Sequence, residues 1–156
     1  MRAHAAGSEP LPVPAGPLRF QASTWYLLAI AGAQARHLWA ETLAQLKVSP
    51  SQSKVLRALG ESGPLGQHQL AELISVDPRN AVPLIDSLAG RGLLARDVDP
   101  ADRRRRVLTL TARGQQLAAD LESIGAEVED DFLSPLTAPE RESLRQMMLA
   151  LLYAER

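Results

Sequence analysis

The middle third of the sequence carries the start and stop signals of several short helices, and this order constrains the fold most strongly. Ser49 can cap a helix that has Pro50 at its first position, and Gln52 would complete a capping box. Either Gly60 or Gly63 would end that helix. The spacing therefore predicts one helix of about three turns directly after residue 49.

Two further short helices are expected immediately downstream. The stretch GQHQLAELI predicts a helix of two to three turns. The next helix would have Asp77 as its N-cap and Pro78 at its first position, and Gly90 and Gly92 would stop it. Three short helices with tight turns between the last two are typical of a helix-turn-helix.

A β-hairpin should follow these helices. The runs LLARDV and RVLTLT contain β-forming residues, and the turn-rich stretch DPADRR separates them. Four consecutive arginines, residues 103–106, would then lie at the hairpin tip and the start of its second strand. A helix-turn-helix followed by a basic hairpin is a winged helix, so the sequence predicts a mainly α fold with a small β-hairpin wing.

Long helices are expected at both ends of this winged helix. Residues 18–46 lack proline and predict an N-terminal helix. Thr111 can cap a long helix, and TAPE at 137–140 can start another. Their apolar stripes are Leu117, Leu121, Ile124, Val128 and Phe132, then Leu144, Met147, Met148, Leu151 and Leu152. One small winged helix cannot bury all of them, which favours a helical homodimer interface over packing within a single protomer.

Charge is distributed unevenly along a chain whose formal net charge is only −1. Residues 79–114 hold eight arginines and four aspartates, whereas residues 115–156 hold nine acidic residues and three arginines. A basic middle and an acidic C-terminal third predict one face built for an anionic partner.

Several classes of function are disfavoured by what the sequence lacks. It has no cysteine and only three scattered histidines, so no thiol chemistry, metal site or cofactor is expected. It also lacks a glycine-rich phosphate loop and a nucleophile with a plausible base, which argues against an enzyme. No apolar run is long enough for a membrane span and no signal-peptide pattern follows Arg2. A cytoplasmic protein without membrane contact is expected.

Arginines at the wing tip suit nucleic acid because the guanidinium is planar, permanently charged and weakly hydrated. Arg103, Arg104, Arg105 and Arg106 are therefore predicted to contact phosphates or the minor groove. Asp102 beside them would hold an arginine in position rather than touch DNA. The alternative is an ordinary solvated loop, which is the more frequent role of a charge run.

The helix before the wing would be the recognition helix. Arg79 and Asn80 near its start suit guanine and adenine edges, and Val82, Pro83 and Ser87 would share its outward face. Ala81, Leu84, Ile85 and Leu88 would face inward. Ser51, Gln67 and His68 on the preceding helices are predicted supporting DNA contacts. Ordinary surface polar residues are the alternative for Arg79 and Asn80.

Pro83 is unusual at this position. A proline inside a helix removes a backbone donor and costs on the order of 3 kcal/mol. We expect either a bend here or a helix that becomes regular only after Val82. Val82 and Pro83 could also make apolar contact with a thymine methyl group.

Three segments together resemble the MarR family of dimeric winged-helix transcription factors. They are VLRALGESGPLGQHQLAELISVD, NAVPLIDSLAGRGLLAR and DPADRRRRVLTLTARG. The last is similar to that family's wing, Asp-Pro-x-Asp-Arg-Arg followed by a strand and Leu-Thr-x-x-Gly. The resemblance covers residues 18–155 and implies that Asp102, Arg103 and Arg104 form the wing signature, with Arg79 and Asn80 facing the major groove.

Two positions depart from the family pattern. A Thr-Arg pair is frequent where this chain has Val82 and Pro83, and another arginine is common at the position of Ser87. Base readout should therefore be altered, or depend more on Arg79, Asn80 and the wing.

The resemblance also implies a small-molecule effector. Family members often bind an aromatic acid or phenol between the dimer helices and the winged helix, which loosens their hold on DNA. Trp25, His37 and Trp39 on the N-terminal helix are candidate pocket residues. The alternative is that both tryptophans lie in the dimer core and that His37 is a surface residue. Residues of these types occupy such positions more often than ligand pockets.

The sequence thus predicts a homodimeric, sequence-specific DNA-binding regulator that represses until a small aromatic ligand releases it. Its expected partner is double-stranded DNA carrying a pseudo-palindromic operator. The predicted organisation is a Pro-rich arm (1–17), an N-terminal dimerisation helix (18–48), the winged helix (49–111) and C-terminal dimerisation helices (112–156). The alternative is a winged-helix protein-interaction module without DNA binding.

Overall fold

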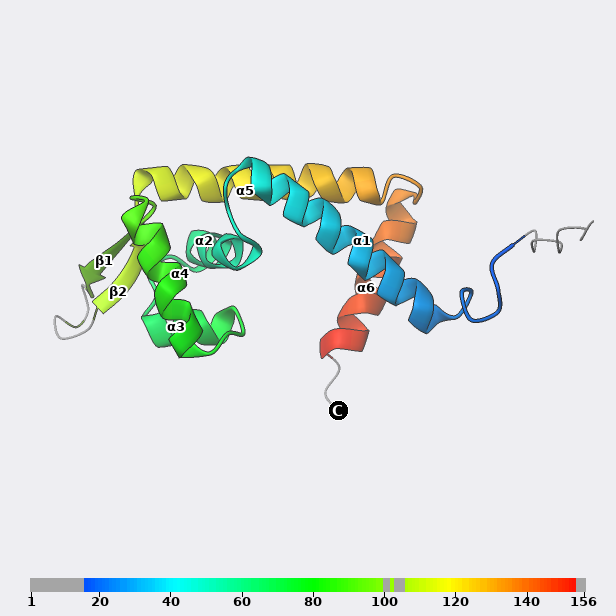
Figure 1. The fold of residues 1–156 in the computed structure, drawn as a ribbon, viewed down its shortest axis with the longest axis horizontal. Helices are drawn as coiled ribbons and strands as arrows, with labels where there is room; N and C mark the ends of the chain where they lie inside the picture. Colours follow the sequence, from blue (N-terminus) through cyan, green and yellow to red (C-terminus); the bar gives the residue numbers. More distant parts are fainter. Residues whose placement is uncertain (1–15, 100–101, 103–105, 154–156) are drawn as a thin grey trace, which may run out of the picture. The chain divides into compact units, whose positions relative to one another are not determined.

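The computed structural model describes residues 16–99, 102 and 106–153 and confirms the expected fold class. These residues form helices and one antiparallel hairpin (Figure 1): α1 Thr24–Gln45, α2 Pro50–Ser62, α3 Gln67–Leu73, α4 Pro78–Gly90, β1 Leu94–Val98, β2 Arg106–Leu110, α5 Ala112–Phe132 and α6 Ala138–Tyr153. The chain divides into two compact units, residues 1–36 and 37–156, and the boundary falls within α1.

The predicted N-caps of the middle helices are confirmed. At α2 the Ser49 hydroxyl accepts from the Gln52 N–H (3.1 Å), and the Gln52 side chain accepts in return from the Ser49 N–H (3.0 Å). Gly63, with φ of 72°, ends that helix. At α4 the Asp77 carboxylate accepts from the Arg79 N–H (2.7 Å). These local bonds fix where each helix begins.

The N-terminal helix begins later than the sequence predicted. We expected a helix from residue 18, but α1 starts at Thr24 and residues 19–22 form turns. Ser23 provides the physical reason, because its hydroxyl lies 3.4 Å from the Tyr26 N–H and donates to the Phe20 carbonyl (2.6 Å). The predicted arm at residues 1–17 lies almost entirely outside the described residues.

The two strands of the hairpin pair in antiparallel orientation, as expected for two runs joined by a short turn-rich stretch. Leu94 pairs with Leu110 at one end and Val98 with Arg106 at the other. Leu65, in the connection between α2 and α3, adds a bridge to Leu108, with N–H to carbonyl bonds in both directions (3.2 and 2.8 Å). The hairpin is thereby joined to the helical part and contacts α4 and α5 (Figure 1).

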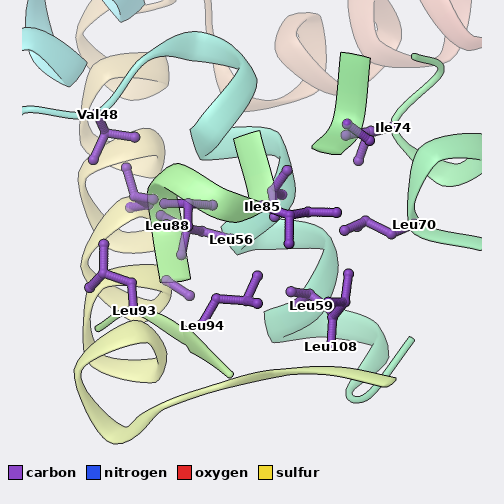
Figure 2. Packing of buried hydrophobic residues seen from close by; sticks show 14 of the residues in the cluster. Val48, Leu56, Leu59, Leu70, Ile74, Ile85, Leu88, Leu93, Leu94 and Leu108 are labelled. Atoms are coloured by element: carbon purple, nitrogen blue, oxygen red, sulfur yellow. The ribbon is translucent and has the colours of Figure 1, made fainter. Parts of the chain in front are cut away.

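One apolar core holds the second unit together. Figure 2 shows side chains that converge from the helices α2 to α4 and from the hairpin: Leu56, Leu59, Leu70, Ile74, Ile85, Leu88, Leu93, Leu94 and Leu108. Ala118 and Leu121 of α5 belong to the same core. Ala81, Ile85 and Leu88 of α4 are buried as predicted, and Leu84 packs against them half-buried. Because the inward face of α4 is fixed by this core, its opposite face must point to solvent.

The end of α4 and the start of α5 meet in a tight backbone junction. Gly92 adopts a φ of 68°, and its carbonyl accepts from the Thr111 hydroxyl (2.8 Å). The Leu93 carbonyl accepts from the Thr111 N–H (3.2 Å), and the Gly114 N–H donates to the Thr111 hydroxyl (3.1 Å). Thr111 therefore caps α5, as predicted, and also joins it to the chain that enters the wing.

α4 is continuous through Pro83, which overturns one of the two expected outcomes for that residue. The helix extends from Pro78 to Gly90 and does not begin after Val82. The Asp77 cap and the buried Ala81 hold the first turns in helical conformation despite the proline. Pro83 has no N–H, so the carbonyl of Arg79 lacks its usual helical donor.

Replacing Pro83 with alanine should therefore stabilise the protein by about 1–2 kcal/mol. The substitution restores one helical hydrogen bond and removes a steric conflict, while the added freedom of the unfolded chain offsets part of the gain. The midpoint of urea unfolding should rise accordingly. Pro78→Ala is the matched control, since proline at the first helical position is favourable and its removal should not stabilise. An unchanged or lower midpoint for Pro83→Ala would contradict this account of α4.

The C-terminal helix leaves its apolar residues uncovered within the described chain. α6 has no buried residue, and Met147, Leu151, Leu152 and Tyr153 are all more than half exposed. At its start the Glu140 carboxylate accepts from both the N–H and the hydroxyl of Thr137 (2.8 and 2.7 Å). These bonds lower the pKa of Glu140 and fix the first turn. A helix of this composition is expected to be covered by another surface.

Candidate nucleic-acid interface

The first turn of α4 presents two side chains that can read base edges. Arg79 and Asn80 follow the Asp77 cap and Pro78, and both are exposed. Within the described part of the chain, neither side chain makes a hydrogen bond or an ion pair. An arginine can donate two bonds to guanine and an asparagine can bond adenine through both amide atoms, so this turn is equipped for direct readout.

The remaining predicted contacts on α4 also lie on its exposed face. Val82, Pro83 and Ser87 are exposed, whereas Ile85 of the same helix is buried. Ser87 is already engaged, because its hydroxyl accepts from the Gln52 side-chain amide of α2 (3.0 Å). Gln52, the second member of the α2 capping box, therefore also contacts the exposed face of α4.

An ion pair attaches the wing to this same helix. The Arg96 guanidinium of β1 contacts the Asp86 carboxylate of α4, and both side chains are about half exposed. Across the hairpin, the Thr109 hydroxyl donates to the Asp97 carboxylate. An ion pair at this exposure contributes little to stability. It does show that the base of the wing lies beside α4.

Part of the predicted wing contact set lies outside the described residues. This holds for Arg103, Arg104 and Arg105, which belong to the segment between β1 and β2. Arg106 is the first residue of β2, pairs with Val98 and is exposed. Asp102 is also exposed. The roles of these five residues in contacting or positioning DNA remain predictions.

The predicted supporting residues all lie at helix starts. Ser51 is in the first turn of α2, and Gln67 and His68 open α3. All three are exposed, and His68 faces Glu72 across one helical turn (3.6 Å from Nδ1 to Oε1). In the first turn of α2, Pro50 lacks an N–H and the Gln52 N–H already donates to Ser49, so this helix end offers few backbone donors to a phosphate.

The three candidate ligand-pocket residues differ in their surroundings. Trp25 belongs to the first compact unit and is 83% exposed. In the second unit His37 faces Glu41 (3.4 Å), while Trp39 is half-buried. The Arg57 guanidinium lies 5.9 Å from the centre of the Trp39 ring. Trp39 therefore packs against the core while His37 remains at the surface.

A cavity of about 740 Å³ lies between α2, β2 and α5, and the predicted pocket residues are not among those that line it. Its walls include Arg57, Gly60 and Pro64 on one side and Leu110, Ala118 and Glu122 on the other. Arg57 connects this cavity with Trp39, because it contacts that ring and also pairs with Glu122 (3.1 Å from Nη2 to Oε2). Sequence reasoning missed Arg57 and Glu122.

The contacts that sequence reasoning missed share one property. Asp86 with Arg96, Gln52 with Ser87 and Arg57 with Glu122 join residues that are 10, 35 and 65 positions apart. No local pattern links such pairs. The spacing rules of a single helix do not reach across the fold, so only the packed structure reveals these pairs.

The described residues hold neither a candidate metal site nor a helix that could cross a membrane. No cluster of histidine, cysteine and acidic side chains there has the arrangement to hold a metal ion. None of the described helices is both long enough and apolar enough to cross a membrane.

Comparisons with known proteins agree with this architecture. The MarR family model matches residues 48–105, from the end of the α1–α2 turn into the wing. The transcriptional regulator HosA of Escherichia coli O111:H- is 31% identical over 116 residues, which cover 74% of this chain and 84% of HosA. The transcriptional repressor Rv2887 of Mycobacterium tuberculosis is 31% identical over 123 residues, covering 79% and 88%.

A solved structure extends the similarity to the whole fold. BpsR of Bordetella bronchiseptica, whose DNA binding is regulated by 6-hydroxynicotinic acid, superposes with a TM-score of 0.73. It is 26% identical to this chain, and the match covers 90% of this chain and all of BpsR. The order of helices and wing, the matched segment and the identity to HosA over most of both sequences lead to one conclusion: the chain belongs to the MarR family of transcriptional regulators.

Proposed function

We propose that this protein is a homodimeric, sequence-specific DNA-binding repressor that a small aromatic acid releases from its operator. The observation that carries the proposal is the placement of Arg79 and Asn80 on an exposed helix face to which the Asp86–Arg96 ion pair ties the wing. One face of the second unit thereby combines a base-reading turn with the base of an arginine-rich hairpin. The two recognition helices of a dimer would enter successive major grooves roughly 34–36 Å apart.

The uncovered apolar surface of α6 supports the homodimer. Met147, Leu151, Leu152 and Tyr153 would remain in water in a lone protomer. In the first unit, Trp25, Leu27 and Ile30 of α1 are likewise exposed. Covering such helices with the same helices of a second copy buries both stripes at once and gives the two-fold symmetry that a pseudo-palindromic operator requires.

The cavity beside α2 supports regulation by a small ligand. It is lined by apolar groups together with the Arg57 guanidinium. If the ion pair between Arg57 and Glu122 breaks, Arg57 can pair with the carboxylate of a ligand instead. α2 also contacts the reading face through the Gln52–Ser87 bond. A ligand that prefers a shifted position of α2 would therefore alter the placement of α4. The regulation of BpsR by 6-hydroxynicotinic acid is consistent with an acidic aromatic effector.

The test is DNA binding by fluorescence anisotropy, using the duplex upstream of this protein's own gene and a scrambled duplex of equal composition. Titrations at several salt concentrations should show tighter binding to the first duplex and a steep loss of affinity with salt for both. Sedimentation of the free protein should give the mass of two chains. Absence of binding at low salt would overturn the proposal and favour a protein-interaction module. Equally weak binding to both duplexes would show that the protein does not recognise a specific sequence in the DNA upstream of its gene.

A further inference from the structure

The centre of the exposed face of α4 is apolar. Val82 has 37% of its surface exposed, and Pro83 beside it is exposed as well. The two residues follow the polar pair Arg79 and Asn80 after one buried residue, Ala81. An exposed valine and proline at the middle of a proposed recognition helix cannot form hydrogen bonds to a base through their side chains.

The polar residues beyond this apolar centre are engaged within the protein. Asp86 is paired with Arg96 of the wing. The Ser87 hydroxyl accepts from the Gln52 amide. Both groups therefore orient α4 against its neighbours, and both already have partners before DNA is present. Beyond the first turn, the surface that α4 offers to a groove is dominated by Val82 and Pro83.

Only one base presents an apolar group in the major groove. Thymine carries its C5-methyl group there, whereas the edges of guanine, adenine and cytosine present polar acceptors and donors. Placing Val82 and Pro83 against a polar edge would desolvate that edge without replacing its hydrogen bonds. The rigid ring of Pro83 loses little conformational freedom on contact, which favours a fixed apolar surface.

From this geometry we infer that Val82 and Pro83 form a thymine-reading surface, so that each operator half-site carries thymine at the base pair facing the middle of α4. The inference rests on the proposed function, because it assumes that α4 lies in the major groove. Successive turns of α4 would then make different base contacts: Arg79 and Asn80 bind the polar edges of bases, and Val82 and Pro83 contact a thymine methyl group.

The experiment removes the methyl group alone. Duplexes bound tightly by the wild-type protein are first selected from a random pool. Each half-site thymine of the selected duplex is then replaced by deoxyuridine, symmetrically in both halves, which leaves base pairing intact. Burial of one methyl group corresponds to roughly a fourfold change in affinity, so a symmetric pair should weaken binding about 15-fold at one position and little elsewhere.

Val82→Ala links that effect to the protein. This variant should bind the thymine duplex more weakly than wild type does, and its affinity ratio between thymine and deoxyuridine duplexes should fall toward one. Val76→Ala is the matched control, because it makes the same truncation at half-buried Val76, which packs against the core and is neither a predicted DNA contact nor part of a dimer stripe. That control should keep the full wild-type ratio. Thermal unfolding of both variants confirms that they are folded.

The outcomes separate this inference from the function on which it rests. Failure to select any duplex would overturn the proposed repressor itself. Tight, specific binding without a deoxyuridine-sensitive position would overturn the thymine-reading surface while leaving the repressor intact. A sensitive position that Val82→Ala leaves fully sensitive would assign the methyl contact to another part of the protein and would also overturn the inference.

Discussion

Replacing Gly114 with alanine should destabilise the protein by about 3 kcal/mol or more. A Cβ atom at Gly114 would lie 1.9 Å from the carbonyl oxygen of Leu93 and 3.0 Å from its carbonyl carbon. The obstacle is backbone, which cannot rotate away as a side chain can. The junction must therefore open, which breaks the bonds that Thr111 makes to Gly92 and Leu93. Overpacking of this kind costs 1–3 kcal/mol, and loss of the cap adds about 1 kcal/mol.

Differential scanning calorimetry would measure the effect as a fall in Tm of roughly 2–4 °C for each kcal/mol. Gly125→Ala on the same helix is the matched control. Its new Cβ would meet only the Trp39 ring at 3.6 Å, an ordinary contact, and alanine is the better helix former by about 0.5–1 kcal/mol. The two substitutions should thus move Tm in opposite directions. A Gly114→Ala protein as stable as wild type would show that α5 and Leu93 are not in close contact.

Because Leu93 leads directly into β1, the same substitution should also disturb the wing. The strand begins one residue later, at Leu94, and carries Arg96, the partner of Asp86. We therefore expect the folded fraction of Gly114→Ala to bind DNA more weakly than wild type. The glycine of the Leu-Thr-x-x-Gly sequence thus has a steric role: it lets α5 approach the chain entering the wing.

The double substitution Arg104→Ala and Arg105→Ala should weaken DNA binding on the order of 100-fold at low salt. Each arginine is expected to contact phosphate or the minor groove, and charged hydrogen bonds of this kind are among the strongest available to a protein. The loss should be similar for the operator and for scrambled DNA, because phosphates carry no sequence information. The slope of log K against log salt should become shallower by roughly 0.9 for each phosphate contact removed.

Asn80→Ala provides the contrast within the same interface. It removes a predicted base contact without changing charge, so it should cost about 1–3 kcal/mol on the operator and little on scrambled DNA. Its salt dependence should equal that of wild type. If both variants lost affinity equally on every duplex, the division between a phosphate-binding wing and a base-reading helix would be wrong. Sedimentation should show dimers in both cases, because neither change touches the terminal helices.

Local signals in the sequence determined most of the elements. Ser49 with Gln52, Asp77 and Thr111 each cap the helix that they were predicted to cap, since these bonds form between residues at most three positions apart. The apolar spacing of α4 likewise identified Ala81, Ile85 and Leu88 as its buried face. The hairpin followed from two β-forming runs around a turn.

Prediction from sequence was weaker where two local signals compete. At Pro83 the propensity rule opposed the periodicity of the buried face, and α4 stays continuous because the Asp77 cap and the buried Ala81 hold its first turns. At the start of α1 no proline or glycine marked the boundary, and Ser23 ended the turns at a position that composition alone did not reveal. A cap and tertiary burial decide the first case and a single hydroxyl decides the second.

What the sequence by itself determined is therefore the order of elements, their caps and the side chains on each helix face. The tertiary structure alone decided which faces meet: Asp86 with Arg96, Gln52 with Ser87, and Arg57 with both Trp39 and Glu122. The physical reason is how far apart the contacting residues lie in the sequence. A cap or a helix face depends on neighbours within a few residues, whereas these contacts require the core to bring α2, α4, α5 and the wing together first.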